Sequence, residues 1–192
     1  MKKIPSHPAC YQIIENIPFA KLTRFYFLKD CSILYTAKYK KNHFYIGSGD
    51  CFHIHEKRVE NCAQITCDKD NYNKVVREDQ EFAICFVGYS GGYSIDVSFE
   101  NNGEKLHWEP KEVKEDAEFD GEYKHSPIHT DRNIILQDSK MKNCLIIRKM
   151  SKEVIEAECN PDVNPIIIFA IAISQIIGPF SSGHNFHKSF VN

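Results

Sequence analysis

A group of basic residues is the first feature of the sequence that could bind a ligand. Lys38, Lys40 and Lys41 stand close together and are followed by His43, where one predicted strand ends in a turn. Residues two apart on a strand point to the same side, so Lys38 and Lys40 could converge on a phosphate group. The alternative is a solvated hairpin tip whose lysines protect a sheet edge. Lys38, Lys40 and Lys41 are therefore a candidate site for an anionic lipid head group.

A second basic zone contains Lys140, Lys142, Arg148 and Lys149, near another predicted hairpin. Two such zones predict at most a weak membrane-facing patch, because each basic residue near an anionic surface contributes about 1 kcal/mol. Over all 192 residues, 24 Lys and Arg face 26 Asp and Glu, which gives a formal net charge of -2. This balance argues against a general polyanion-binding surface, and no nucleic-acid partner is expected.

Cysteine and histidine residues form a possible metal-binding group. Cys51, His53 and His55 alternate along one predicted strand, and Cys62 and Cys67 follow. Zinc accepts these ligand types, and four of them would close a structural site. The spacing contains no repeated ligand pair of the kind that zinc sites use, and buried thiols beside a polar face are more common. We predict no metal and no cofactor.

Catalytic motifs give little support for an enzyme. HExxH and the phosphate-binding P-loop are absent, and the one GxSxG match, at residues 88–92, lies at a predicted turn between two strands, not in the strand-to-helix turn that this motif needs. Glu156 and Glu158 lie close in sequence, but a catalytic carboxylate pair needs pKa values tuned by burial, which nearness alone does not provide. The sequence thus predicts a protein that is not an enzyme.

Short strands must position these residues. Alternating apolar and polar residues predict strands at 33–40, 93–99 and 154–159, and residues 82–87, apolar on both faces, predict a covered central strand. Residues 110–120 alternate in charge without an apolar period and predict an exposed loop. Turn residues separate about ten to twelve such strands.

One helix is predicted, at Pro165–Ile177, between Asn164 as the N-cap and Gly178 at the end. It is apolar on every side apart from Ser174 and Gln175, so it must be buried on every side. Among strands, only a closed sheet can cover it completely, although a helix on one face of a sandwich is the alternative. The predicted fold is mainly β, a closed antiparallel barrel of about twelve strands around this helix. At about 20 Å the helix is shorter than the roughly 30 Å core of a bilayer, so no transmembrane span is expected.

The predicted organisation has three parts. Residues 1–19 contain three prolines and are interpreted as an irregular lead-in, residues 20–180 as the barrel, and residues 181–192 as a tail. The N-terminus lacks the apolar stretch of a signal peptide, and the sequence lacks a CxxC pair. These features predict free thiols and a cytoplasmic location.

Four stretches of the chain carry a family resemblance. They are ILYTAKYKKNHFYIG (33–47), RNIILQDSK (132–140), NCLIIRKMSKEVIEAEC (143–159) and NPIIIFAIAISQIIG (164–178). In this order they resemble the tubby C-terminal-like group, which includes tubby proteins, phospholipid scramblases and the LURP-one-related proteins. The resemblance covers residues 33–178 in patches. It implies a twelve-stranded barrel around a central helix.

The resemblance also implies a ligand. Tubby proteins bind membrane phosphoinositide, chiefly PI(4,5)P2, through a Lys and an Arg two residues apart in a G-K-x-R segment. Gln64 and Thr66 occupy the corresponding places in this sequence. Neutral side chains cannot form the charge-assisted hydrogen bonds that hold a phosphate group most strongly. We therefore expect a peripheral domain that binds an anionic lipid head group elsewhere on its surface, or else a protein-interaction domain with no lipid ligand.

Overall fold

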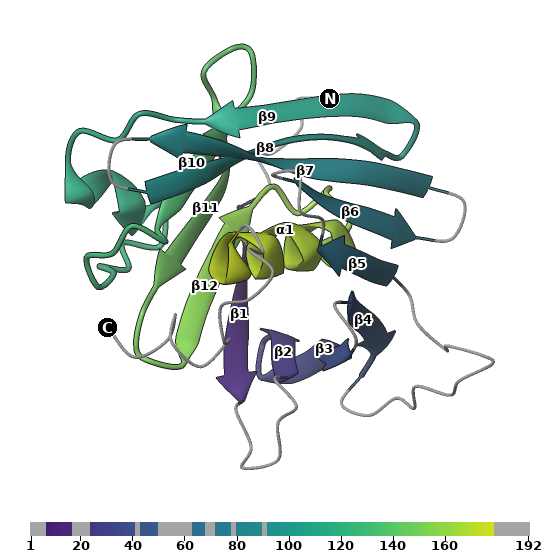
Figure 1. Cartoon of the computed structure of the whole chain (residues 1–192). Helices are drawn as coiled ribbons and strands as arrows, with labels where there is room; N and C mark the ends of the chain where they lie inside the picture. The colour runs from purple at the N-terminus through teal and green to yellow at the C-terminus, as the bar shows by residue number, and fades with distance from the viewer. Residues whose placement is uncertain are drawn as a thin grey trace, which may run out of the picture.

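The fold is a closed barrel of antiparallel strands with a helix inside, as seen in a computed structural model of the chain (Figure 1). The structure describes residues 7–16, 24–40, 43–49, 63–67, 72–77, 80–89 and 92–178. Its elements are β1 (Ala9–Asn16), β2 (Arg24–Lys29), β3 (Ser32–Lys40), β4 (His43–Ser48), β5 (Ala63–Cys67), β6 (Tyr72–Arg77), β7 (Gln80–Tyr89), β8 (Gly92–Asn101), β9 (Glu104–Pro110), the 3-10 helix η1 (Asp116–Asp120), β10 (Ile134–Gln137), β11 (Asn143–Lys149), β12 (Val154–Cys159) and α1 (Pro165–Ile177). The predicted fold class is confirmed.

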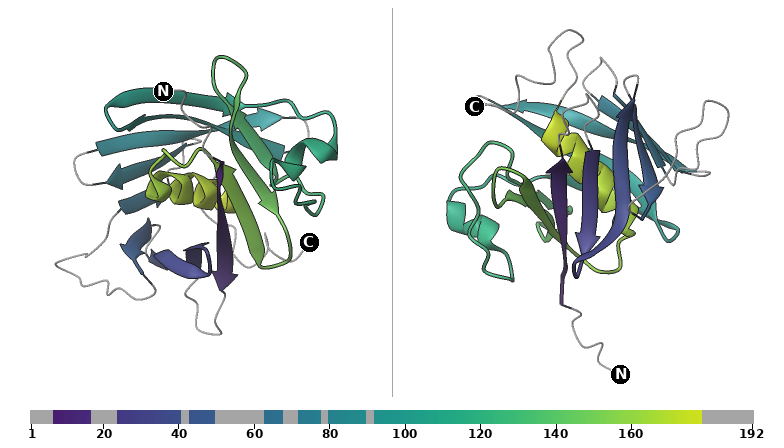
Figure 2. Two further views of the ribbon diagram at one scale, coloured as in Figure 1. Left: turned by 180° about the vertical axis from the view of Figure 1, so that it is seen from behind. Right: turned by 90° about the horizontal axis from the view of Figure 1, so that it is seen from below.

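Each strand pairs with its neighbours in the sequence, and β1 closes the barrel by pairing with both β2 and β12. Tyr11 on β1, for example, lies opposite Ala157 on β12. Closure leaves no long unpaired edge among the described strands, which removes the usual route to edge-to-edge aggregation. Figure 2 shows the strands curving around the helix from two further directions.

The interpretation of residues 1–19 as an irregular lead-in is wrong, because β1 spans Ala9–Asn16 within that stretch. Ala9, Tyr11 and Ile13 alternate along this strand, and all three are buried in the barrel. The flanking prolines concealed this period, since Pro8 precedes the strand and breaks none of its hydrogen bonds. The described barrel therefore begins at Ala9, and the predicted tail at 181–192 lies outside the described residues.

The helix α1 is buried along its whole length, as its composition requires. Every residue from Ile166 to Ile176 is buried. Asn164 caps its start by accepting a hydrogen bond from the backbone N–H of Ile166 at 3.1 Å. At its end Gly178 has φ +69°, and a Cβ there would overlap the hydroxyl of Tyr93. That hydroxyl donates to the carbonyl of Gln175, so the helix end is tied to β8.

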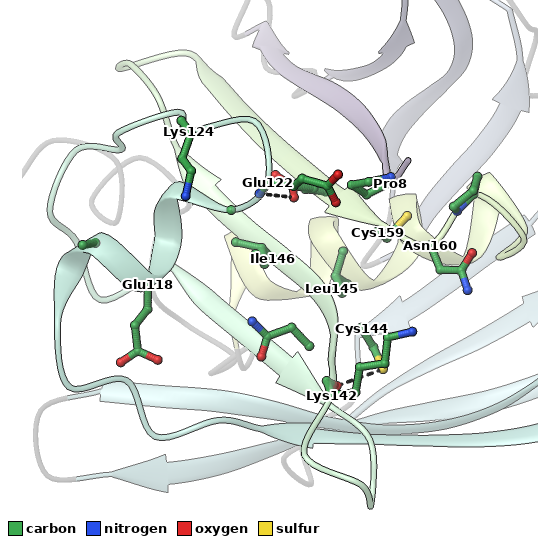
Figure 3. Close-up of a pocket in the computed structure, with 15 residues that line it drawn as sticks. Pro8, Glu118, Glu122, Lys124, Lys142, Cys144, Leu145, Ile146, Cys159 and Asn160 are labelled. Carbon is green, nitrogen blue, oxygen red and sulfur yellow. Dashed lines mark hydrogen bonds between the residues drawn. The ribbon is translucent and has the colours of Figure 1, made fainter. Parts of the chain in front are cut away.

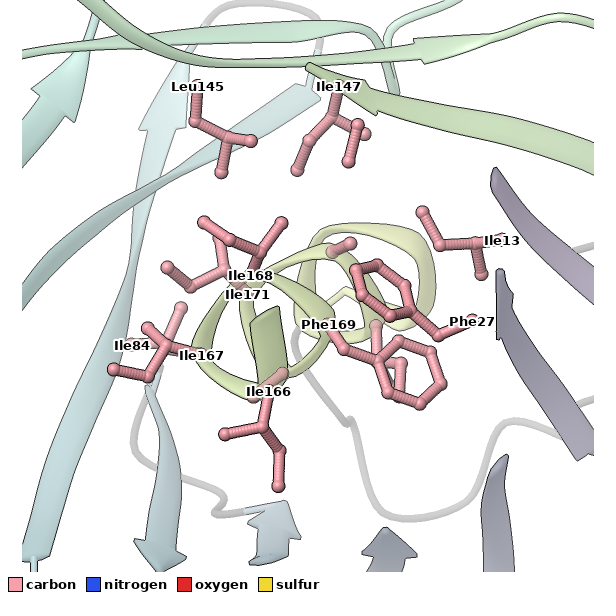
Figure 4. Close-up of a cluster of buried hydrophobic side chains, with 14 of the residues drawn as sticks. Ile13, Phe27, Ile84, Leu145, Ile147, Ile166, Ile167, Ile168, Phe169 and Ile171 are labelled. Carbon is pink, nitrogen blue, oxygen red and sulfur yellow. The ribbon is translucent and has the colours of Figure 1, made fainter. Parts of the chain in front are cut away.

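Aromatic and branched side chains fill the space between α1 and the strands. Phe27 on β2 stacks on Phe169 of the helix, with ring centroids 4.8 Å apart. Figure 4 shows Ile84, Leu145 and Ile147 pointing from other strands toward the same helix. This mainly apolar interior supplies the main stabilisation of the fold, although Asn73, Ser174 and Gln175 are buried as well.

A second, smaller apolar cluster lies outside the barrel. Phe119 of η1 packs on Ile135 of β10 and Ile146 of β11. The segment 111–133, between β9 and β10, is held against the barrel by this contact. Residues 110–120 were predicted to be an exposed loop, and all of them except Phe119 are exposed or half-exposed; the one buried aromatic residue is enough to anchor the segment. We call segment 111–133 the covering loop.

Candidate functional site

Two charged parts of the outer barrel surface contain residues that the sequence analysis singled out. The first, which we call the open wall, is the outward face of β2 to β6. In the register, Arg24 lies opposite Lys38, Lys38 opposite Tyr45, and Tyr45 opposite Gln64. Directly opposed residues on antiparallel strands point to the same side. Arg24, Lys38 and Gln64 therefore lie in one row across this wall.

A second row runs beside the first. Thr66 lies opposite His43 on one side and Lys74 on the other, and the backbone of Lys40 pairs with His43. The neutral Gln64 and Thr66 thus lie between strands that carry basic residues. Lys74 also forms an ion pair with Glu81 at 2.8 Å. Of the predicted site, Lys38 is placed on the open wall, only the backbone of Lys40 is described, and Lys41 lies outside the described residues.

Spacing limits what the open wall can bind. Lys38 and Lys74 are three strands and two residues apart, which corresponds to roughly 16 Å between their backbones. Side chains on the convex outer face of a barrel diverge, so the ammonium groups of Lys38 and Lys74 do not converge on one phosphate group. The open wall offers several separate positive charges, an arrangement that suits a charged surface better than one small anion.

The second charged part, which we call the covered wall, is the outward face of β1, β11 and β12 beneath the covering loop. Its centre is Arg148, whose side chain is fully buried. Arg148 Nη2 lies 2.9 Å from Glu158 Oε2, and Arg148 Nε lies 3.3 Å from Glu156 Oε2. Its Nη1 group donates to the carbonyls of Phe119 and Asp120 at 3.0 Å. Arg148 was predicted to belong to a surface basic zone, but its charge is neutralised by carboxylates beneath the covering loop.

The carboxylates of the covered wall are held as firmly as the arginine. Glu156 and Glu158 side chains are only 7% and 5% exposed. Glu158 Oε1 accepts a hydrogen bond from the backbone N–H of Glu122 at 2.8 Å. Its Oε2 makes no well-directed hydrogen bond, so its 2.9 Å approach to Arg148 acts as an ion pair. The approach of Glu158 to Gly121 leaves no room there for a Cβ.

His125 and Cys10 border the same network. His125 Nδ1 lies 2.7 Å from Glu156 Oε2, and the imidazole is 41% exposed. Burial, with a further contribution from the nearby carboxylate of Glu156, raises the pKa of the Cys10 thiol to about 11. Cys10 is therefore protonated at neutral pH and is not an activated nucleophile.

Beside the covered wall lies a cavity of about 570 Å³ (Figure 3). The covering loop and the starts of β1 and β11 form it, with Glu158 at its buried side and Lys124 and Lys142 among its lining residues. Two thiols also line it. Burial raises the pKa of Cys159 to about 12 and the pKa of Cys144 above its ordinary value. The cavity has the size of a small-molecule site, but neither thiol is ionised for catalysis.

The predicted cysteine and histidine group falls outside what the structure describes. Cys51, His53, His55 and Cys62 lie in residues that are not described, and Cys67 is placed only by its backbone in β5. The residues that the sequence interpretation missed are Cys10, His125, Glu156 and Glu158 as one cluster. The alternation of Glu156 and Glu158 on an otherwise buried strand was the available signal, because two carboxylates on one face need a cationic partner.

Comparison with known proteins found no protein-family model and no curated protein that matches the chain. Among the described residues, no helix is long and apolar enough to cross a bilayer.

Proposed function

We propose that this chain is a non-enzymatic, tubby-like barrel that binds an anionic membrane surface peripherally through its open wall. The observation that carries the proposal is the strand register, which puts Arg24, Lys38 and Lys74 on one outward face. The barrel around an apolar helix is also the fold that the tubby resemblance implies. The five cysteines whose side chains the structure describes are free, which favours a cytoplasmic location.

Energetics suggest weak and salt-dependent binding. Arg24 and Lys38 at about 1 kcal/mol each give roughly 2 kcal/mol near an anionic leaflet, and Lys74 adds less because it is paired with Glu81. Charges beyond about 8 Å are screened at physiological ionic strength, so the attraction weakens as salt is added. Neutral Gln64 and Thr66 in the middle of the wall argue against a tight site for one phosphoinositide. The proposed ligand is therefore the charged lipid surface, with individual head groups held by separate basic residues.

Vesicle sedimentation tests this proposal. The full chain is mixed at low salt with phosphatidylcholine vesicles that contain phosphatidylserine, PI(4,5)P2 or neither. We expect binding to both anionic compositions, and roughly 30-fold weaker partitioning for Arg24→Ala/Lys38→Ala, since two charges of about 1 kcal/mol are lost. The matched control is Lys105→Ala/Lys114→Ala, which removes two exposed charges away from the open wall and should partition like the parent chain, apart from a small effect of net charge.

Two outcomes contradict the proposal. Equal loss in the test and control variants would show that net charge, not the open wall, drives binding. No sedimentation with either anionic vesicle at low salt would end the lipid interpretation and leave the alternative, a protein-interaction domain. Gln64 and Thr66, the neutral pair at the family's basic positions, favour that alternative.

A further inference from the structure

Three side chains at the edge of the covered wall bring together ligand types that transition metals prefer. Cys10 comes from β1, Glu156 from β12 and His125 from the covering loop. One potential ligand atom from each lies within 4.8 Å of the other two. Around a tetrahedral zinc ion such atoms are about 3.5 Å apart, given zinc–ligand bonds of about 2.0–2.3 Å. Shifts of roughly 1 Å would bring the three atoms into range.

The local charge favours a bound cation. Arg148 supplies one positive charge to the covered wall, whereas Glu156 and Glu158 supply two negative charges, and all three side chains are buried. The network is therefore one positive charge short when the imidazole of His125 is neutral. Buried charges that are not compensated are costly, so the site gains when a cation joins it.

Neighbouring contacts hold the three ligands in place. Glu156 Oε2 is oriented by Arg148 Nε, and the backbone N–H of His125 donates to the carbonyl of Asp120 at 3.0 Å. The hydroxyl of Tyr123 donates to the carbonyl of Pro8, which joins the covering loop to the start of β1. Such outer contacts fix the orientation of metal ligands. The half-exposed imidazole leaves a path for an ion from solvent.

We propose that Cys10 Sγ, His125 Nδ1 and a carboxylate oxygen of Glu156 bind a divalent transition metal of the zinc class, with a fourth position open to water. On binding, the Cys10 S–H bond breaks, the thiolate forms the metal–sulfur bond, and the proton goes to solvent. The metal takes the place of the proton that Nδ1 shares with Glu156 Oε2 in the metal-free protein, and this proton passes through solvent to Nε2, so that the bound imidazole is neutral. The charges then sum to zero: two from the metal and one from Arg148 against one thiolate and two carboxylates.

Arg148 sets the main cost of this arrangement. Its Nη2 group lies 3.4 Å from His125 Nδ1, so the metal and the guanidinium would be close neighbours. The guanidinium is already paired with Glu158 and with two backbone carbonyls, which spreads its charge away from the metal. The competing arrangement is a proton on His125 that satisfies Glu156 directly, with no metal.

Cobalt titration of the chelator-treated full chain distinguishes these arrangements. Co²⁺ stands in for Zn²⁺ and gives a thiolate-to-cobalt charge-transfer band. We expect one equivalent to bind, Zn²⁺ to displace it, and the band to disappear in Cys10→Ser. Because one thiol proton is released, affinity should rise about tenfold per pH unit near neutrality. His125→Ala should weaken binding by at least about tenfold. Circular dichroism checks that each variant is folded.

Two controls make the assignment specific. Cys31→Ser removes an exposed thiol elsewhere on the barrel and should leave the band unchanged. Cys51→Ser/Cys62→Ser tests the metal group that the sequence suggested, and it should also leave the band unchanged. A band that survives Cys10→Ser but disappears in the second control would overturn the proposal. Full cobalt affinity in His125→Ala, or no stoichiometric binding by the parent chain, would also overturn it.

Discussion

The open wall and the covered wall are built from the same strand pattern but have opposite environments. Each carries a basic residue on an outward strand face with a glutamate partner. Lys74 on the open wall is 44% exposed and pairs with Glu81 at 2.8 Å. Arg148 on the covered wall is 0% exposed and pairs with Glu158 at 2.9 Å. The two ion pairs have almost the same length, so geometry alone does not distinguish them.

What distinguishes them is the covering loop. It excludes water from Arg148 through the contact of Phe119 with Ile135 and Ile146. In water an ion pair contributes little, because solvent already stabilises both charges. Without water each charge depends on its protein partners, so removing one partner leaves the others uncompensated. The comparison teaches that the charges of the covered wall depend on their protein partners, whereas those of the open wall remain in contact with solvent.

Replacing Arg148 should produce the largest effect. Arg148→Ala leaves Glu156 and Glu158 buried without their cation and leaves the carbonyls of Phe119 and Asp120 without a donor. We expect the free energy of unfolding to fall by about 3–5 kcal/mol, as for other buried pairs that lose one partner. Urea denaturation followed by circular dichroism measures the change.

Two controls sharpen this comparison of the walls. Lys74→Ala breaks the exposed pair, and its free energy of unfolding should match the parent within experimental error. Arg148→Met/Glu156→Gln/Glu158→Gln removes every charge of the network and should recover part of the loss seen in Arg148→Ala, because no buried charge is then left unpaired. Equal effects of Lys74→Ala and Arg148→Ala would show that the covering loop does not exclude water.

The inner face of the barrel could be predicted from the sequence because it depends on local pattern. The apolar run of α1 required complete burial, and alternation along strands gave the faces that cover it. β1 was missed because its short apolar series, Tyr11 and Ile13, lies between prolines. The outer face could not be predicted in the same way. Alternation along the strand puts Arg148 on the outward face, but it does not reveal that a distant loop covers that face.

The candidate sites show the same limit. Lys38 and Lys40 were selected because they are neighbours on one strand, a relation that sequence reveals directly. Cys10, His125 and Glu156 come from two strands and a loop, and only the closure of β1 onto β12 brings them together. Sequence spacing does not predict that these three residues meet, because their meeting depends on barrel closure and on the anchoring contact of Phe119.

Gly121 tests how tightly the covering loop is fitted to the covered wall. It has φ +65°, and a Cβ there would overlap Glu158 Oε2 and approach Arg148. Gly121→Ala should lower the free energy of unfolding by about 2–3 kcal/mol, from left-handed backbone strain of about 1–2 kcal/mol together with displacement of the ion pair. Thermal and urea unfolding both report the change.

The matched control for Gly121 is Gly103, which has φ +81° in a turn with open space around its Cα. Gly103→Ala therefore measures the backbone strain without the clash, and it should cost about 1 kcal/mol. If the two alanine variants are equally stable, the loop can move away from Glu158 freely, and the covered wall is less rigid than its contacts indicate.

Glu15 shows what a buried carboxyl does without the arginine that the covered wall provides. Its Oε1 is buried with no hydrogen-bond partner. Burial raises the pKa of Glu15 to about 7, although Arg132 and Lys149 act in the opposite direction. The unfolded chain loses this proton near pH 4.5, the ordinary value. Between these two pH values the folded state holds a proton that the unfolded state has released. The contribution of Glu15 to the free energy of unfolding therefore falls as pH rises.

We therefore expect the parent chain to lose stability from Glu15 between about pH 4.5 and 7, by about 1–2 kcal/mol once partial exposure is allowed for. Glu15→Gln should flatten this part of the pH profile and be more stable than the parent at pH 8, because an amide is never ionised. Glu104→Gln, at an exposed position, is the control and should keep the parent profile. If Glu15→Gln also keeps that profile, Arg132 and Lys149 compensate the charge of Glu15 as fully as Arg148 compensates that of Glu158. An arginine beneath a covering loop would then not be the only way in which this barrel stabilises a buried carboxylate.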